Sequence, residues 1–120
     1  MVEVVFPHQT NHYGTLFGGH AMAMMDKAAF VAASRHARTQ VVTASSERIE
    51  FHAPARHGDL VELTARVVAT GRTSLSVEVE MHAEDLLSGE RRRVTSGRFT
   101  MVALGEDGRP TPVPPLGDDA

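Results

Sequence analysis

A single carboxylate interrupts the most apolar stretch of the chain, GGHAMAMMDKAAFVAA at residues 18–33. On a helix, the same-face neighbours of Asp26 would all be apolar: Met22, Ala23, Ala29, Phe30 and Ala33. Lys27 is adjacent in sequence but would point about 100° away. An unpaired buried carboxylate costs several kcal/mol or has a raised pKa. Two interpretations stay open: a catalytic base or nucleophile in a cleft, and a structural carboxylate that bonds a neighbouring element.

Two glycines and an asparagine precede this stretch. Gly18 and Gly19 open the apolar run, where the first N–H groups of a helix have no internal partner and lie at its positive end. Such amides can bind an anion or polarise a carbonyl oxygen, although the glycines could simply permit a tight entry turn. Asn11 either caps a turn through its own side chain or orients a water or a substrate carbonyl. His20 is either polar surface or a supporting contact beside the glycines.

Arginines supply candidate phosphate ligands in two places. Arg91, Arg92 and Arg93 open a predicted strand, and strand alternation would send Arg92 to the face opposite the other two. Such a cluster can hold phosphates bidentately or form a solvated strand end. The turn GRTS at residues 71–74 offers Arg72 and Ser74 in the same way, with hairpin closure as the alternative.

The composition excludes several classes of function. The 120 residues fit one domain, and a net charge of −3 gives no overall attraction to nucleic acid. The chain has no cysteine, and neither the His8/His12 nor the His52/His57 pair is joined by a carboxylate at a metal-binding spacing, so we expect no metal site. No apolar run reaches the roughly 18 residues that span a bilayer. The start of the chain does not look like a signal peptide, which favours a cytoplasmic location without membrane association.

The elements follow from hydrophobic periodicity. Residues 19–36 predict one helix, and residues 2–6 a short strand ending before Pro7. Four long strands are predicted at 41–51, 60–70, 73–84 and 92–104, the third with strict alternation of apolar and polar residues. The segment 105–120 is rich in Pro, Gly and Asp, so we expect it to run extended along a surface, with a flexible end at 117–120.

This order predicts an α+β fold of one helix against an antiparallel sheet of about five strands. The helix is apolar nearly all round, so it should be buried on most sides. One such sheet does not wrap it completely, and we therefore expect a second subunit to supply the remaining cover.

Several short motifs occur together and in order. They are N-x-x-G-x-x-F-G-G at 11–19, MMD at 24–26, VTAS at 42–45, IEFHAP at 49–54, GD at 58–59, GRTSL at 71–75 and DGRPTPVP at 107–114. Over residues 2–116 the chain resembles the hotdog-fold acyl-CoA thioesterases, most closely the bacterial and mammalian cytosolic type. The resemblance implies one hotdog domain over residues 1–116, with a long helix wrapped by a curved antiparallel sheet.

The resemblance also implies a site and an assembly. In that family two subunits form one continuous sheet, dimers often assemble into hexamers, and active sites lie at the dimer interface. The resemblance places the catalytic aspartate at Asp26, its asparagine from the opposite subunit at Asn11, and the carbonyl-polarising amides at Gly18 and Gly19. His20 departs from the family, whose members often carry an apolar or aromatic residue there.

The implied reaction is hydrolysis of the thioester of a fatty acyl-CoA, with Asp26 as general base or nucleophile. We expect CoA phosphates near Arg72, Thr73 and Ser74, and at Arg93, and an acyl chain beside Met22 and Phe30. No cofactor is expected, because coenzyme A is part of the substrate. A non-catalytic acyl-CoA-binding protein and a hotdog dehydratase or hydratase are the alternatives.

Overall fold

The computed structural model describes residues 1–117, which form one helix packed on one antiparallel sheet. The elements are β1 (Val2–Val4), the 3-10 turn η1 (Pro7–Gln9), α1 (Gly18–Ala37), β2 (Gln40–Phe51), β3 (Leu60–Thr70), β4 (Ser74–Glu84) and β5 (Arg91–Leu104). The predicted helix and long strands are confirmed to within one residue at each end. The first strand is shorter than predicted, because Val5 leaves the ladder to bond the loop at Asp59.

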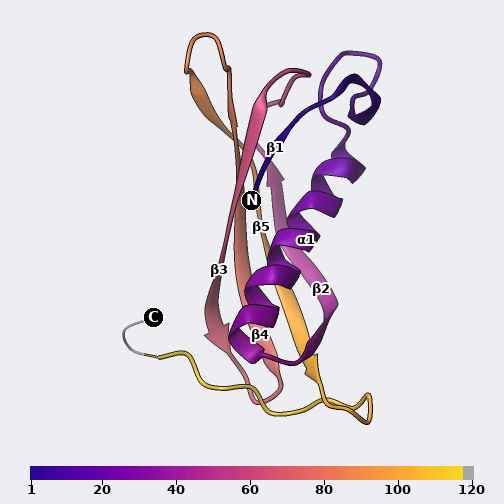
Figure 1. Cartoon of the computed structure of the whole chain (residues 1–120), viewed down its shortest axis with the longest axis vertical. Helices are drawn as coiled ribbons and strands as arrows, with labels where there is room; N and C mark the ends of the chain where they lie inside the picture. Colours follow the sequence, from indigo (N-terminus) through magenta and orange to yellow (C-terminus); the bar gives the residue numbers. More distant parts are fainter. Residues whose placement is uncertain (118–120) are drawn as a thin grey trace.

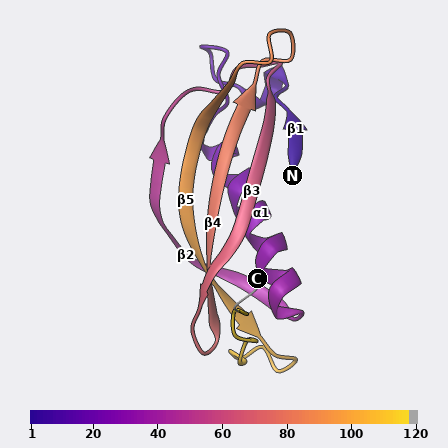
Figure 2. The same ribbon diagram turned by 90° about the vertical axis from the view of Figure 1, so that its left-hand side faces the viewer.

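The strands lie in the order β1-β3-β4-β5-β2, and every adjacent pair is antiparallel. Figure 2 shows the sheet in front with α1 behind it, so one face of the sheet covers the helix. β4 alternates strictly between buried and half-buried residues. Its buried side packs with Met25, Ala29 and Ala33 of α1 in a single core. The predicted α+β architecture is therefore confirmed.

The two edges of the sheet differ in length and in cover. β1 has three residues, and the N-terminal ammonium donates to the carbonyl oxygen of Leu63 at 3.0 Å. β2 has twelve residues, and residues 42–48 are all exposed. In Figure 1, β2 lies beside α1 along the right side of the molecule. A long exposed edge strand offers unpaired backbone groups to another chain.

The segment after β5 runs along the lower end of the molecule, as predicted (Figure 1). Val113 N–H donates to the carbonyl of Arg72 at 3.0 Å, and a ring nitrogen of His36 lies 2.8 Å from the carbonyl of Pro114. The predicted flexible end lies outside the described residues except for Gly117. Within residues 1–117, no helix is long and apolar enough to cross a membrane.

Candidate active site

Asp26 lies in the middle of α1, half-buried, and bonds a neighbouring strand. The hydroxyl of Thr43 in β2 donates to Oδ1 of Asp26 at 2.6 Å. This contact is the neighbouring-element partner that the sequence left open. The other residues described offer no further hydrogen bond to the carboxylate, and Lys27 forms no ion pair with it. One oxygen is therefore held while the second, Oδ2, remains available.

Thr43 is the functional candidate that sequence reasoning missed. Its position depends on an irregularity in the β2–β5 ladder, where the register shifts between Thr43 and Ser45. Such a bulge re-aims side chains and is common beside active sites. Sequence periodicity does not reveal it, although Thr43 belongs to the VTAS motif.

Gly18 and Gly19 form the first turn of α1. Phe17 is the N-cap, and its carbonyl accepts from the amides of His20 and Ala21, both at 3.0 Å. Within the described residues, the Gly18 and Gly19 amides have no hydrogen-bond partner. A Cβ at Gly18 would meet only the Phe51 ring, at 3.9 Å, and one at Gly19 only the Phe17 ring, from 3.4 Å. Packing within the protomer therefore does not demand glycine, and the two free amides are open to a second molecule.

Asn11 holds its own loop and keeps one group free. Its Oδ1 accepts from the backbone N–H of Tyr13 at 2.9 Å, and from the backbone N–H and hydroxyl of Thr15 at 3.3 and 3.1 Å. The predicted turn-capping role is confirmed. Because the two amide donors fix Oδ1, the Nδ2 group is identified as the remaining donor. No described residue accepts a hydrogen bond from it.

The contact with Gln9 indicates which tautomer the neutral ring of His20 adopts. Gln9 Oε1 accepts from the Phe6 amide at 2.8 Å, so its NH₂ group faces Nε2 of His20 at 2.9 Å. Nε2 of His20 must then accept, which places the proton of the neutral ring on Nδ1. His20 therefore supports the loop before the helix through Gln9.

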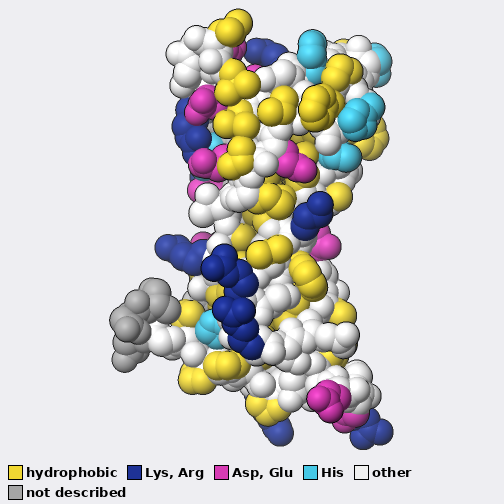
Figure 3. Space-filling view, viewed as in Figure 1, with side chains coloured by type: hydrophobic (Ala, Val, Ile, Leu, Met, Phe, Trp, Pro, Cys, Tyr) yellow, Lys and Arg dark blue, Asp and Glu magenta, His cyan; other side chains and the backbone are white. Residues whose placement is uncertain are grey.

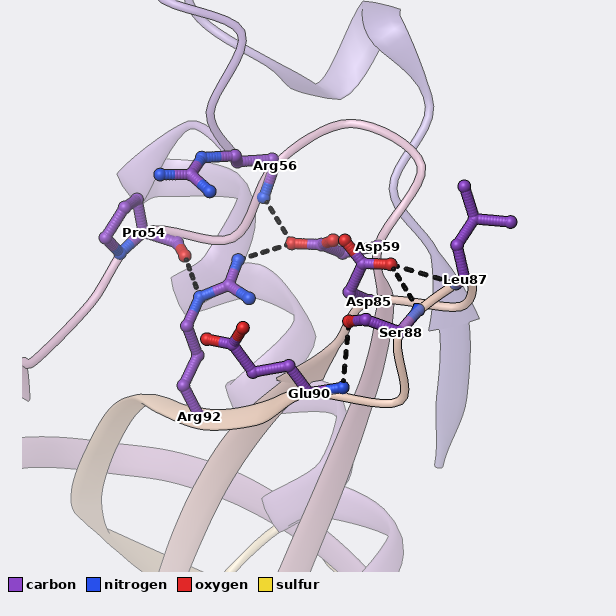
Figure 4. A network of polar contacts seen from close by, with 8 residues as sticks. All are labelled: Pro54, Arg56, Asp59, Asp85, Leu87, Ser88, Glu90 and Arg92. Carbon is purple, nitrogen blue, oxygen red and sulfur yellow. Dashed lines mark hydrogen bonds and ion pairs between the residues drawn. The ribbon is translucent and has the colours of Figure 1, made fainter.

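The loop between β2 and β3, residues 52–59, is a second loop that holds the Asn11 loop in place. Leu16 N–H donates to the carbonyl of Ala55 at 2.6 Å, and Thr15 forms an isolated bridge with Arg56. Figure 4 shows how this second loop is anchored: Arg92 donates to Oδ2 of Asp59 at 2.6 Å and to the carbonyl of Pro54 at 3.0 Å. This ion pair is mostly buried, with 21% and 10% of the two side chains exposed.

The expected CoA-binding residues lie away from Asp26 within one protomer. The turn with Arg72, Thr73 and Ser74 lies beside the chain's last segment, at the opposite end of the molecule from the start of α1 (Figure 1). Arg93 lies on the outer face of the sheet, 3.4 Å from Glu80. Arg92 faces the other way, as alternation predicted.

The two expected acyl-chain residues lie on either side of Asp26 along α1. Met22 is half-buried and packs against the core, and Phe30 is 48% exposed one turn after Asp26. Among the described residues, no group of three or more His, Asp or Glu side chains could hold a metal ion.

Comparison with known proteins identifies the family. The model of the thioesterase superfamily matches residues 13–90. An uncharacterized acyl-CoA thioester hydrolase of Zymomonas mobilis is 44% identical over 96% of this chain and 77% of that protein. A hexameric acyl-CoA thioesterase, solved in its apo form, superposes with a TM-score of 0.93 at 43% identity, over 99% of this chain and 78% of that one.

A second solved structure adds information about the site. An acyl-CoA hydrolase of Staphylococcus aureus, in complex with butyryl coenzyme A and coenzyme A, superposes with a TM-score of 0.92 at 36% identity, over 98% of this chain and 71% of that one. Solved variants of it replace an asparagine, an aspartate 15 positions later and a threonine 17 positions beyond that with alanine. Asn11, Asp26 and Thr43 have the same separations. The chain belongs to the thioesterase superfamily and, within it, to the acyl-CoA thioester hydrolases.

Proposed function

We propose that the protein hydrolyses the thioester of an acyl-CoA to a free acid and coenzyme A. The Thr43–Asp26 hydrogen bond carries this proposal, because it holds one carboxylate oxygen and leaves Oδ2 for reaction. The acyl-CoA hydrolases with the same spacing of Asn, Asp and Thr support the assignment.

The reaction can proceed in two ways from this carboxylate. As a general base, Asp26 takes a proton from water while the water oxygen attacks the thioester carbon. As a nucleophile, Oδ2 attacks that carbon and forms an anhydride, which water then hydrolyses. In either case the C–S bond breaks and the CoA sulfur leaves as the thiolate, which takes up a proton.

The oxyanion donors for this step come from a second subunit. Gly19 and Asp26 are seven residues apart on one helix, so their groups are separated by about 10 Å along its axis. A carbonyl in contact with Asp26 is therefore beyond the reach of the Gly18 and Gly19 amides of the same chain. The partner's helix start and Asn11 loop lie at one end of its protomer, and we place both beside Asp26. There the free amides and Nδ2 of Asn11 would stabilise the oxyanion or orient the water.

The exposed edge of β2 is where we place this second subunit. Pairing of two β2 strands would extend the sheet and cover the side of α1 that carries Asp26. The hexameric thioesterase supports further assembly of such dimers. We also propose that Arg72, Thr73 and Ser74 contact the CoA phosphates in the assembled oligomer. Arg93 contributes less to phosphate binding, because its guanidinium already contacts Glu80. Met22 and Phe30 line the site of the acyl chain. No cofactor is required, and the location we propose is the cytoplasm.

Release of CoA thiol from a panel of acyl-CoA esters, from acetyl to palmitoyl, tests the proposed activity. We expect thiol release by the wild type and a fall in kcat/KM of at least about 100-fold in Asp26→Ala, since proton-transfer groups contribute that much or more. CoA binding by the variant should persist. Hydrolysis by Asp26→Ala at the wild-type rate would refute the assignment.

A further inference from the structure

A groove of about 850 Å³ lies between the second half of α1 and β3, away from the proposed reaction site. Its floor is aliphatic and is formed mainly by Val31 and Ala32 of α1 and by Leu63 and Val67 of β3. Its volume is within the range of small-molecule sites. We call it the arginine groove, because Arg35, Arg38 and Arg66 form its rim.

The charges of the arginine groove all have one sign. Of its lining residues the three arginines are charged, Met1 carries the N-terminal ammonium, His36 adds a further basic group, and none is acidic. Within residues 1–117, no carboxylate lies within 4 Å of Arg35 or Arg38. Arg66 makes one long contact, at 4.0 Å, with Glu78. Figure 3 shows Lys and Arg side chains in a row over the strip between β3 and the lower half of α1, with hydrophobic side chains beside them.

The groove and Asp26 lie on different sides of α1. Asp26 faces β2 through Thr43, whereas Ala28, on the β3 side, is about 200° further round the helix. A ligand in the groove would therefore not contact the Asp26 carboxylate of the same chain.

We propose that the arginine groove binds the anion of a free fatty acid of medium or long chain. The aliphatic floor suits an alkyl chain, and a guanidinium can hold a single carboxylate bidentately. Apart from His36, no lining residue offers a ring on which a nucleobase could stack. The site is additional to the proposed hydrolysis site, and the acid it would take belongs to the same chemical class as the proposed product.

The end of α1 limits where the carboxylate can lie. The last carbonyls of the helix form a negative end, which disfavours an anion close to Arg38. Arg35 lies almost one turn earlier on α1, whereas the guanidinium of Arg66 in β3 lies 4.0 Å from Glu78 on the outer face of the sheet. The head group is therefore assigned to Arg35, with the alkyl chain lying over Val31 and Ala32.

Calorimetric titration with dodecanoate tests the site, using wild-type protein already saturated with a non-hydrolysable dodecyl-CoA thioether. We expect one dodecanoate per chain, with affinity reduced about fivefold or more in Arg35→Glu by charge reversal. Arg109→Glu makes the same charge change at another exposed arginine and should stay within about twofold of wild type. Val31→Asp, at a residue 44% exposed, should abolish binding by placing a carboxylate on the floor. The neutral ligand dodecanol should bind about fivefold or more weakly than dodecanoate.

Three outcomes would overturn the proposal: no binding to the saturated protein, equal weakening by Arg35→Glu and Arg109→Glu, or light scattering that shows Arg35→Glu dissociating an oligomer. The last result would identify the groove as an interface between copies of the chain. Failure of the thioether itself to bind would instead count against the proposed acyl-CoA hydrolase function, and dodecanoate can then be titrated into the unliganded protein.

Discussion

The two edges of the sheet differ in how far contacts within the chain hold them in place. At the β1 edge, three residues pair with β3, the N-terminal ammonium bonds Leu63, and Arg92 anchors the adjoining loop through Asp59. At the β2 edge, a long exposed strand lies next to the half-buried Asp26. Polar contacts within the chain hold the first edge where β1 pairs with Leu60–Glu62. The second edge lies beside the candidate reactive group on α1, and our proposal places a further chain against it.

The largest effect on folding is expected at the β1 edge, in Asp59→Ala. Removing Asp59 leaves the Arg92 guanidinium mostly buried and unpaired, which should lower the free energy of unfolding by about 3–5 kcal/mol. Chemical denaturation measures this. Replacing Glu80, whose contact with Arg93 is half-exposed, with Ala is the control and should cost about 1 kcal/mol or less. Equal losses in the two variants would show that the Asp59–Arg92 pair does not anchor the loop.

A smaller loss of stability is expected for Gly97→Ala in β5, next to Ile49 of β2. A Cβ at Gly97 would overlap Cδ1 of the half-buried Ile49 and lie 3.3 Å from Cε of Met25, so the end of the Ile49 side chain would have to move. Overpacking of this kind typically costs about 1–3 kcal/mol, measurable as a lower denaturation midpoint. Gly18→Ala is the control, because the added Cβ meets only ordinary contact within the protomer. Gly89→Ala is unsuitable as a control because the φ of Gly89 is +76°. An unchanged midpoint in Gly97→Ala would mean that Ile49 is not packed there.

Matched charges at the two edges separate their roles. Val42→Asp in β2 and Val2→Asp in β1 change residues that are 46% and 54% exposed in the protomer. A buried unpaired carboxylate is costly, so only Val42→Asp should weaken association of the chains. Light scattering over a dilution series should show a rise of about tenfold or more in its dissociation constant, with Val2→Asp near wild type. The reverse order would place the interface at the β1 edge.

The smallest effect concerns pH and the strand next to β1. A hydrogen bond from Arg91 and its charge lower the pKa of Glu62 below its ordinary value. A carboxylate with a lowered pKa stabilises the fold above its unfolded pKa, and this contribution is lost as the pH falls through the folded value. Glu62→Gln should therefore reduce stability slightly at pH 7 and flatten its dependence below about pH 4.3. Thermal melts across this range measure it, and identical curves for wild type and variant would contradict the role of Arg91.

The fold follows from the sequence because its signals are local and periodic. The alternation of Leu75, Val77 and Val79 with polar residues predicts which face of β4 is buried, and the Ala- and Met-rich run predicts α1. Thr43 could not be predicted as the partner of Asp26, because a ladder irregularity sets which β2 side chain reaches the helix. The Asp59–Arg92 pair depends in the same way on contacts between residues 33 positions apart.

The family resemblance implied that the site is shared between two chains, and the dimensions of one protomer support this expectation. Asn11, Gly19 and Asp26 are close in sequence, yet the length of α1 separates the amides from the carboxylate within one protomer. The proposal that one thioester carbonyl meets groups from two copies rests on this separation.

Mixing two inactive variants measures this central claim most directly. Asp26→Ala and Asn11→Ala chains, co-refolded in equal amounts, should form mixed dimers in half of the cases. Each mixed dimer would hold one site with both residues intact, so CoA thiol release should recover to about a quarter of the wild-type rate. Activity that stays at the mean of the two separate variants, with mixed dimers demonstrated by mass spectrometry, would contradict a site shared between subunits.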